Sequence, residues 1–178
     1  MPTATTGSPA PGSPLLLSLF RYKCWADAEL IMEVHKLDSA AHHSEVLAAT
    51  RILNHIFVVD RIFAAHLSGT KHGYESTNTP GTPKLGVLRQ ALAESDHWYI
   101  DYVAGLNNQA LREPLDFVFT DGQHGRMSRE EILAHLATHG AYHRGAVGRI
   151  LTQLAAQPPR DTFTTFLHKS DPSRRGHA

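Results

Sequence analysis

The stretch Leu133-Ala-His-Leu-Ala-Thr-His-Gly-Ala-Tyr-His-Arg-Gly145 places three histidines, His135, His139 and His143, four residues apart. On a helix, residues four apart have Cβ atoms only about 5–6 Å from each other, so two of these imidazoles can bind one metal ion. Apolar residues around them mark the predicted buried face of the helix: Ile132, Leu136, Val147, Ile150 and Leu154. At about 100° per residue, His139 and His143 fall inside this stripe, whereas His135 lies about 80° from its centre.

Two stacked imidazoles on a buried face need partners for their ring nitrogens, because an unpaired polar group in apolar surroundings is costly. A single histidine there is most simply a satisfied core or surface residue, but the pair favours a shared metal. A third ligand is expected from another helix. His55 lies three residues after Ile52 and four before Val59, at the core-facing edge of an apolar stripe. The sequence therefore predicts a metal site formed by His55, His139 and His143.

The composition limits the class of protein. The chain has 178 residues and is 42% hydrophobic, which suits one domain with a sizeable core. Lys+Arg and Asp+Glu number 17 each, so the excess positive charge on which nucleic-acid binding rests is missing and no nucleic-acid partner is expected. The 13 histidines hint at metal chemistry, although a buffering surface would explain them equally well.

The single cysteine, Cys24, rules out an intramolecular disulfide. No signal-peptide pattern opens the sequence and no apolar run reaches the length of a membrane span, so we expect a cytoplasmic protein without a membrane partner. Cys24 itself is expected in the core rather than as a nucleophile or ligand. It falls on the predicted inward row of the first helix, which comprises Leu17, Phe20, Cys24, Ala28 and Ile31.

Helical periodicity predicts four long helices, at about 14–36, 44–67, 84–106 and from 128 to the prolines at 158 and 159. Ser13 before Pro14 is typical of a helix start, and Ser128 followed by Glu131 is a capping box. Residues 1–14 and 169–178 are expected to be disordered tails around a domain at 15–168. The other histidines of the first half are expected to be exposed to solvent: His35, His42, His43, His66 and His72.

Two connections carry information about the fold. Residues 68–83 form a 16-residue segment without helical period, which is longer than adjacent antiparallel helices need and favours a crossover along the side of a bundle. The stretch Leu115-Asp-Phe-Val-Phe-Thr-Asp-Gly122 predicts one arm of a short β-hairpin before the last helix. The sequence thus predicts an all-α, four-helix bundle with a small hairpin.

Four sequence elements together carry a resemblance to a known family. They are Tyr22-Lys-Cys-Trp25-Ala26-Asp27, Leu53-Asn54-His55, Thr138-His139-Gly-Ala-Tyr-His143-Arg144-Gly145 and Asp161-Thr-Phe-Thr-Thr-Phe166. The chain resembles the DinB-like family over roughly residues 15–168. It differs from the commoner pattern at Ala146, where glutamine often follows His-Arg-Gly, and at Asp27, where asparagine is frequent. These departures bear on substrate contacts more than on the metal.

The resemblance implies a bundle of crossed, up-down-down-up connectivity, commonly a homodimer. It also implies a divalent metal on His55, His139 and His143, with zinc or nickel most typical and iron also compatible. Relatives include metal-dependent transferases and isomerases that use low-molecular-weight thiols. Arg144 and Gly145 are expected to serve helix packing or the dimer rather than catalysis.

These observations favour a metal-dependent transferase or hydrolase acting on a small molecule, in which the metal lowers the pKa of a bound water or thiol. Proteolysis is disfavoured, because Gly140 stands where the zinc-protease motif needs glutamate. Asp96 and Tyr142 are candidate general bases, although solvated roles explain both equally well. Two alternatives stay open: a non-enzymatic metal carrier or sensor, and a metal-free helical bundle with packed histidines.

Overall fold

The structure is a computed structural model, and it describes residues 12–176. It is mostly helical, with one small antiparallel sheet, as the sequence predicts. In chain order the elements are α1 (Pro14–His35), α2 (His43–Leu67), α3 (Leu85–Ala104), α4 (Asn108–Leu111), β1 (Pro114–Val118), β2 (His124–Ser128), α5 (Arg129–Gln153), α6 (Phe163–Ser170) and a final 3-10 turn (Pro172–Arg174). Of the tail expected at 1–14, residues 1–11 lie outside the described residues, and Pro14 already belongs to α1. No helix within residues 12–176 is long and apolar enough to cross a bilayer.

Both predicted helix starts are confirmed. Ser13 caps α1, where its hydroxyl accepts a hydrogen bond from the backbone N–H of Leu16 at 3.3 Å. At the start of α5, the Ser128 hydroxyl accepts from the backbone N–H of Glu131 at 3.2 Å. The Glu131 carboxylate in turn accepts from the backbone N–H of Ser128 at 2.7 Å. Two N–H groups without helical partners are thereby satisfied, which fixes where the histidine-bearing helix begins.

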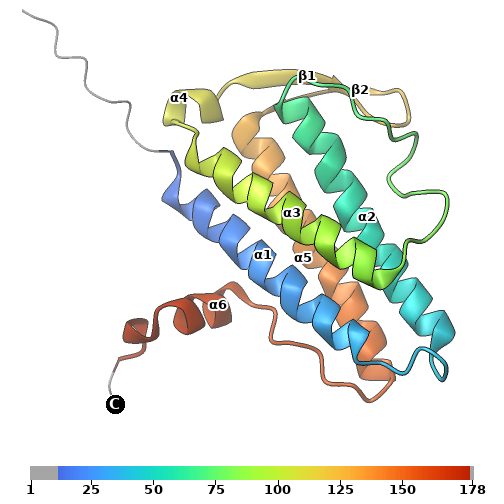
Figure 1. Ribbon diagram of the computed structural model, residues 1–178. Helices are drawn as coiled ribbons and strands as arrows, with labels where there is room; N and C mark the ends of the chain where they lie inside the picture. Colours follow the sequence, from blue (N-terminus) through green and yellow to red (C-terminus); the bar gives the residue numbers. More distant parts are fainter. Residues whose placement is uncertain (1–11, 177–178) are drawn as a thin grey trace, which may run out of the picture.

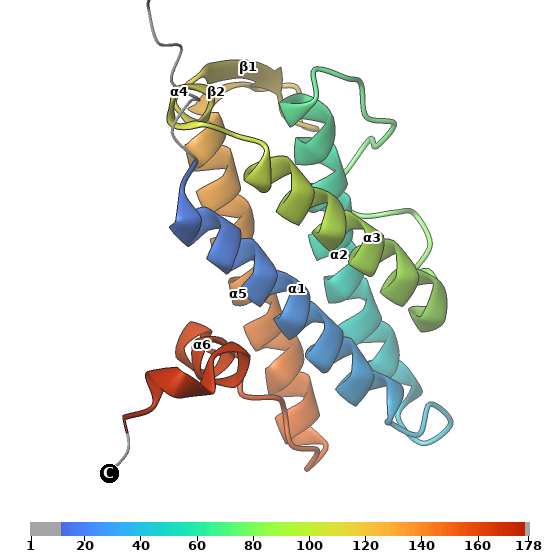
Figure 2. The same cartoon turned by 60° about the vertical axis from the view of Figure 1, so that its left-hand side comes forward.

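Four long helices lie side by side (Figures 1 and 2). α1 packs against α3 and α5, and α2 packs against the same two helices. The apolar side chains between them form two clusters, one near the hairpin around Phe20, Phe63 and Tyr99, and one towards the other end around Leu53 and Leu88. Burying these side chains is the main driving force that holds the helices together.

The 68–83 connection returns along α2 instead of leaving it. The Arg51 guanidinium donates to the backbone carbonyl of Thr79 at 3.0 Å, and the Asn54 amide donates to the Thr79 hydroxyl at 2.8 Å. Arg51 and Asn54 lie several turns before the end of α2 at Leu67. The connection therefore carries the chain back beside α2 before α3 begins at Leu85.

The hairpin lies across one end of the helices and packs on α2 (Figure 1). β1 and β2 are antiparallel, with Pro114 opposite Ser128 and Phe117 opposite Gly125. Gly125 is required at its position, because a Cβ there would come within 2.6 Å of the Phe117 ring. Phe117 is the strand residue that is buried, and its ring meets that of Phe63 edge-on at 5.5 Å.

The predicted inward row of α1 is confirmed at Phe20 and Ile31 but wrong at Leu17, Cys24 and Ala28. The buried positions are Leu16, Phe20, Tyr22, Lys23, Ala26, Asp27, Leu30, Ile31 and Val34. Ala28 is exposed and Cys24 is only half-buried, so Cys24 is not a core residue. The error arises because Lys23 and Asp27 are charged, and charged residues are almost never fully buried unless paired.

The C-terminal part also differs from the expectation. α5 ends at Gln153, before the two prolines, and Ala155 with a positive φ of 55° turns the chain away from the helix. The segment expected to be a disordered tail at 169–178 instead begins with ordered helical turns, since α6 runs to Ser170 and a 3-10 turn follows. α6 packs on α1 through an aromatic contact between Phe166 and Trp25 at 5.8 Å.

Candidate metal centre

The packing of α2 against α5 brings the three predicted ligands together. His55 comes from α2, and His139 and His143 come from successive turns of α5. One ring nitrogen from each lies within 4.8 Å of the other two. The Nε2 atoms of His55 and His139 are 3.1 Å apart, although 84 residues separate them in sequence. The predicted set therefore converges on one point in the fold.

The three rings surround that point at similar spacings. The His143 ring centroid is 4.4 Å from that of His139 and 4.5 Å from that of His55, and the His55 and His139 centroids are 4.9 Å apart. Zinc–nitrogen bonds are about 2.0–2.1 Å long, which places nitrogens that share one ion roughly 3–4 Å apart. The Nε2 atoms of His55 and His139 already have that spacing, and a ring nitrogen of His143 lies within 4.8 Å of the ligand atoms of the other two histidines.

The loop after α2 orients the first ligand. The His55 Nδ1 lies 2.7 Å from the backbone carbonyl oxygen of Thr77, so Nδ1–H donates to that oxygen. The Nε2 lone pair is then left free and turned towards His139. A backbone carbonyl on the remote nitrogen is a common way in which proteins fix the tautomer and the orientation of a metal-binding histidine.

The surroundings keep the α5 imidazoles neutral. Burial, followed by the nearby His143 and His55 rings, lowers the pKa of His139 to about 3. Burial and His55 also lower the pKa of His143. Neutral imidazole is the form that binds a metal, because its lone pair is available. His139 and His143 therefore have the protonation state that coordination requires at neutral pH.

The donor set fits a borderline divalent ion. Three imidazoles suit zinc, nickel or iron, and three protein ligands leave at least one position for water or substrate. The Nδ1 of His139 is buried and has no hydrogen-bond partner in the described residues. The facing Nε2 atoms of His55 and His139 can share one hydrogen bond only if one of them is protonated, whereas an ion between the rings would be bound by both lone pairs.

A cavity of about 180 Å³ adjoins the histidines, between α2, α5 and the tip of the hairpin. His55 and His139 form part of its wall, together with apolar side chains such as Val59, Phe63 and Phe119. Among residues 12–176, no Asp, Glu, Lys or Arg side chain lines it. A molecule bound there would contact both metal ligands and apolar walls.

Two further histidines line this cavity that the sequence did not place at the site. His135 comes from the shoulder of α5, and its ring centroid is 5.3 Å from that of His139. His66 was expected in solvent, but it is only partly exposed and its Nε2 is buried without a hydrogen-bond partner in the described residues. His66 follows the buried Phe63 by three residues, and this spacing was the only sequence signal for its inward position.

The two candidate general bases are placed differently from each other. Tyr142 is 77% exposed, and its ring centroid is 5.1 Å from that of His143, so it lies at the outer edge of the site. Asp96 is buried in α3, where its Oδ1 accepts a hydrogen bond from Lys23 at 2.6 Å. It belongs to a separate group of charges and not to the histidine cluster.

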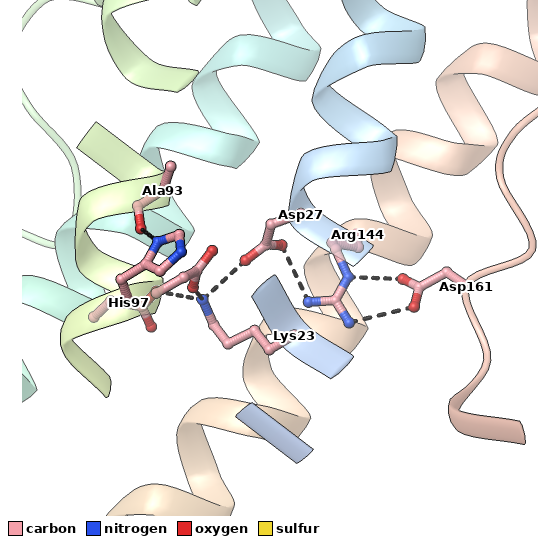
Figure 3. A network of polar contacts seen from close by, with 8 residues as sticks. Lys23, Asp27, Ala93, His97, Arg144 and Asp161 are labelled. Carbon is pink, nitrogen blue, oxygen red and sulfur yellow. Dashed lines mark hydrogen bonds and ion pairs between the residues drawn. The ribbon is translucent and has the colours of Figure 1, made fainter. Parts of the chain in front are cut away.

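That group of charges lies in the centre of the helices (Figure 3). The ammonium of the fully buried Lys23 donates to Asp27, Asp60 and Asp96 at 2.6–2.9 Å. Arg144, one residue after His143, donates to the other oxygen of Asp27 at 3.1 Å. Its guanidinium also bonds Asp161, which ties the segment before α6 to α5. Arg144 thus serves helix packing, as expected.

The buried carboxyls of this group are not equivalent. Burial opposes ionisation of all three, but Lys23 and Arg144 together bring the pKa of Asp27 below its usual value. Burial dominates at Asp60 and raises its pKa to about 6. At Asp96, burial and the neighbouring Asp27 and Asp60 outweigh Lys23 and raise the pKa to about 8. At neutral pH, Asp96 therefore retains a proton for most of the time.

Comparison with known proteins finds a similar protein and a matching family. The chain is 23% identical over 163 residues to protein DinB of Bacillus subtilis (strain 168), and the match covers 84% of this chain and 92% of that protein. No solved structure matches significantly. The profile of the DinB family matches residues 1–175, which is nearly the whole sequence. The chain belongs to the DinB family.

Proposed function

We propose that this protein binds one divalent metal ion on His55, His139 and His143 and uses it as a metal-dependent transferase or hydrolase on a small molecule. The observation that carries the proposal is the convergence of the three ring nitrogens within 4.8 Å. Family membership is compatible with metal binding as well. Zinc or nickel is the proposed ion, and iron also suits three imidazoles.

The cavity beside the histidines favours an enzyme over a non-enzymatic carrier or sensor. A metal carrier gains from a closed shell of protein ligands, whereas a catalytic site keeps a position open for water or substrate. Here two of the three ligands face a cavity of about 180 Å³. When bound, the metal would lower the pKa of a water or thiol enough to form the nucleophile near neutral pH.

The residues around the ion have distinct tasks in this proposal. His55 is held by the carbonyl of Thr77, so its Nε2 stays directed at the ion. The apolar walls of the cavity, including Val59 and Phe63, exclude water from the substrate. Because no formally charged side chain of the described part of the chain lines the cavity, the part of the substrate that enters it is proposed to be uncharged. A low-molecular-weight thiol is one candidate co-substrate.

Metal analysis tests the proposal. The wild-type protein, purified without a nickel column, should carry about one divalent ion per chain. His139→Ala should lose it, because two imidazoles are a much weaker ligand set than three. The matched control is His35→Ala, which removes an exposed histidine at the end of α1 and should keep the metal. Absence of stoichiometric metal in the wild type, with no thermal shift on adding zinc or nickel, would refute the site.

Turnover is tested separately. The metal-loaded protein is assayed with a panel of small thiols and uncharged electrophiles, next to His139→Ala. Activity that survives loss of the metal would contradict metal-dependent catalysis while leaving metal binding intact.

The proposal also covers the connectivity of the helices, the oligomeric state and the location in the cell. The connectivity is proposed to be the crossed up-down-down-up order, supported by the connection that returns along α2 through Thr77 and Thr79 before α3 begins. A homodimer is proposed from the family resemblance, and a cytoplasmic location is proposed from the single cysteine. Light scattering on the purified protein tests the dimer, which a mass of 19.6 kDa in solution would contradict.

A further inference from the structure

A second cavity, of about 310 Å³, lies between α1 and α3, a pair of helices that does not carry the histidines. Its walls are mostly apolar and include Ile31, Leu92 and Ala93. Two members of the buried charge group, Asp27 and Asp96, also line it. Ligand pockets in proteins are typically about 300–1,000 Å³, with apolar walls and a few polar groups, so this cavity has the size and character of a site for a small molecule.

Asp96 gives the cavity one free hydrogen-bonding atom. Its side chain is 2% exposed, and Oδ1 bonds the Lys23 ammonium at 2.6 Å. Its other oxygen, Oδ2, makes no hydrogen bond to any residue between 12 and 176. Asp27 differs, because Lys23 and Arg144 occupy both of its oxygens. Asp96 therefore presents the polar atom that a ligand in the cavity can bond.

The charges around Asp96 favour a positive ligand. The fully buried part of the group contains two cations, Lys23 and Arg144, and three carboxyls, Asp27, Asp60 and Asp96, so the carboxyls exceed the cations by one. A buried charge without a counter-charge is costly, and the group meets this cost by keeping a proton on Asp96. A cation in the cavity would supply the missing charge instead.

The half-buried thiol of Cys24 also lines the cavity, and its pKa is affected by the same carboxyl groups. Burial, followed by Asp96 and Asp27, raises its pKa to about 11, while Lys23 offsets this only in part. The rim of the cavity carries Arg89 and His97. Arg89 is exposed and reaches towards the Met32 sulfur at 3.5 Å, so solvent screens its charge. His97, on the α3 side in Figure 3, bonds the carbonyl of Ala93 through Nδ1 at 2.7 Å.

We propose that the α1–α3 cavity is a binding site for a small monocationic amine with a compact apolar body. The ammonium group donates a hydrogen bond to Oδ2 of Asp96, and the apolar body packs against Ile31, Leu92 and Ala93. Binding converts the neutral Asp96 carboxyl to the carboxylate and releases its proton to solvent. The group then contains three cations and three carboxylates.

Benzylamine and benzyl alcohol form the probe pair, because they share shape and apolar area but only the amine is charged at pH 8. Isothermal titration of the metal-loaded protein should give an affinity about tenfold or more higher for benzylamine, as expected for one hydrogen bond between charged groups. Asp96→Asn should bring the two affinities together. Equal affinities in the wild type, or no binding of benzylamine, would overturn the proposal.

A cavity-filling variant keeps the test independent of the buried charges. Ala93→Phe adds a ring at the exposed side of the cavity and should abolish binding of both probes. The matched control, Ala104→Phe, places the same ring at an exposed position of α3 that does not line the cavity, and should bind as the wild type does. Binding that survives Ala93→Phe would place the amine elsewhere.

Two further measurements separate this site from the histidine site. His139→Ala, which should lack the metal, must still bind benzylamine, and loss of binding there would mean that the amine coordinates the ion. The affinity for benzylamine should also rise about tenfold from pH 6 to 7 and less steeply from pH 7 to 8, since the pKa of Asp96 is about 8 and the carboxylate is required. The groups that face Asp96 are Lys23, Cys24 and Asp27 of α1, Asp60 of α2, His97 of α3 and Arg144 of α5. An equal rise with Asp96→Asn would assign the pH effect to one of them and contradict the proposal.

Discussion

Replacing Lys23 by methionine removes the ammonium that holds three buried carboxyls and keeps most of the apolar stem. In the wild type, this ammonium lies 2.9, 2.7 and 2.6 Å from oxygens of Asp27, Asp60 and Asp96. Removing one partner of a buried ion pair costs about 3–5 kcal/mol, because the other charge is left without compensation. We therefore expect Lys23→Met to lose about 3–5 kcal/mol of unfolding free energy, a large part of the roughly 5–15 kcal/mol typical of a domain.

The loss should depend on pH in a defined direction. Without Lys23, the buried Asp60 and Asp96 bind protons more tightly in the folded state than in the unfolded state. Their folded pKa values then exceed the unfolded value of about 4, and stability falls as the pH rises from there through the folded pKa values. The same trend is present in the wild type, in which the pKa of Asp60 is about 6 and that of Asp96 is about 8. The cost of Lys23→Met should thus be larger at pH 8 than at pH 5.

Urea unfolding followed by circular dichroism at pH 5 and pH 8 measures this cost. Lys36→Met is the matched control, because Lys36 directly follows the same helix and pairs with Glu33 at 2.7 Å, but its side chain is 63% exposed. Such surface pairs contribute about 0–1 kcal/mol. If Lys23→Met costs no more than Lys36→Met, or costs more at pH 5 than at pH 8, the account of the buried charge group is wrong.

Three other predictions concern the metal, the pH dependence and helix packing. Removal of the metal with a chelator should lower the melting temperature by about 5–10 °C. A ligand at a hundred times its Kd stabilises the folded protein by about 2.7 kcal/mol, and each kcal/mol shifts the melting temperature of a domain of this size by about 2–4 °C. An unchanged melting curve would contradict a metal in the folded protein. Burial raises the folded pKa of Asp96 to about 8, so the folded state holds a proton that the unfolded state loses, and the melting temperature of the wild type should fall between pH 4 and 8. Asp96→Asn should make this fall smaller. An unchanged slope would contradict the assignment. Gly140→Ala should destabilise the protein by about 1–3 kcal/mol, since the new Cβ would lie 3.1 Å from the Arg144 guanidinium and 3.3 Å from the Lys23 stem, which their ion pairs hold in place. Gly145→Ala, with open space around it on the same helix, should instead stabilise by about 0.5–1 kcal/mol, and equal effects of the two changes in urea unfolding would refute the packing argument.

The sequence by itself determined the features that depend on local chemistry and periodicity. Ser128 and Glu131 form their capping box within four residues, and Asp121-Gly122 provides the hairpin turn, with Gly122 at a φ of 84°. The histidine set was predictable for a related reason. His139 and His143 are one turn apart on an amphipathic helix, and His55 lies at the edge of a second apolar stripe, so the three rings share one interface once these two faces pack together.

Only the tertiary structure decided which face of α1 is buried and what compensates its charges. Lys23 and Asp27 are inward because partners from α2, α3 and α5 surround them, and no window of the α1 sequence contains those partners. Apolar periodicity treats a charged residue as outward-facing, since the cost of burying one charge is large. Ion pairs with residues from other helices offset the cost of burying these charges, and the paired residues are up to 117 positions apart in the chain. For this reason the sequence predicted the histidine centre, while the buried charges and the α1–α3 cavity beside them became visible only in the folded arrangement.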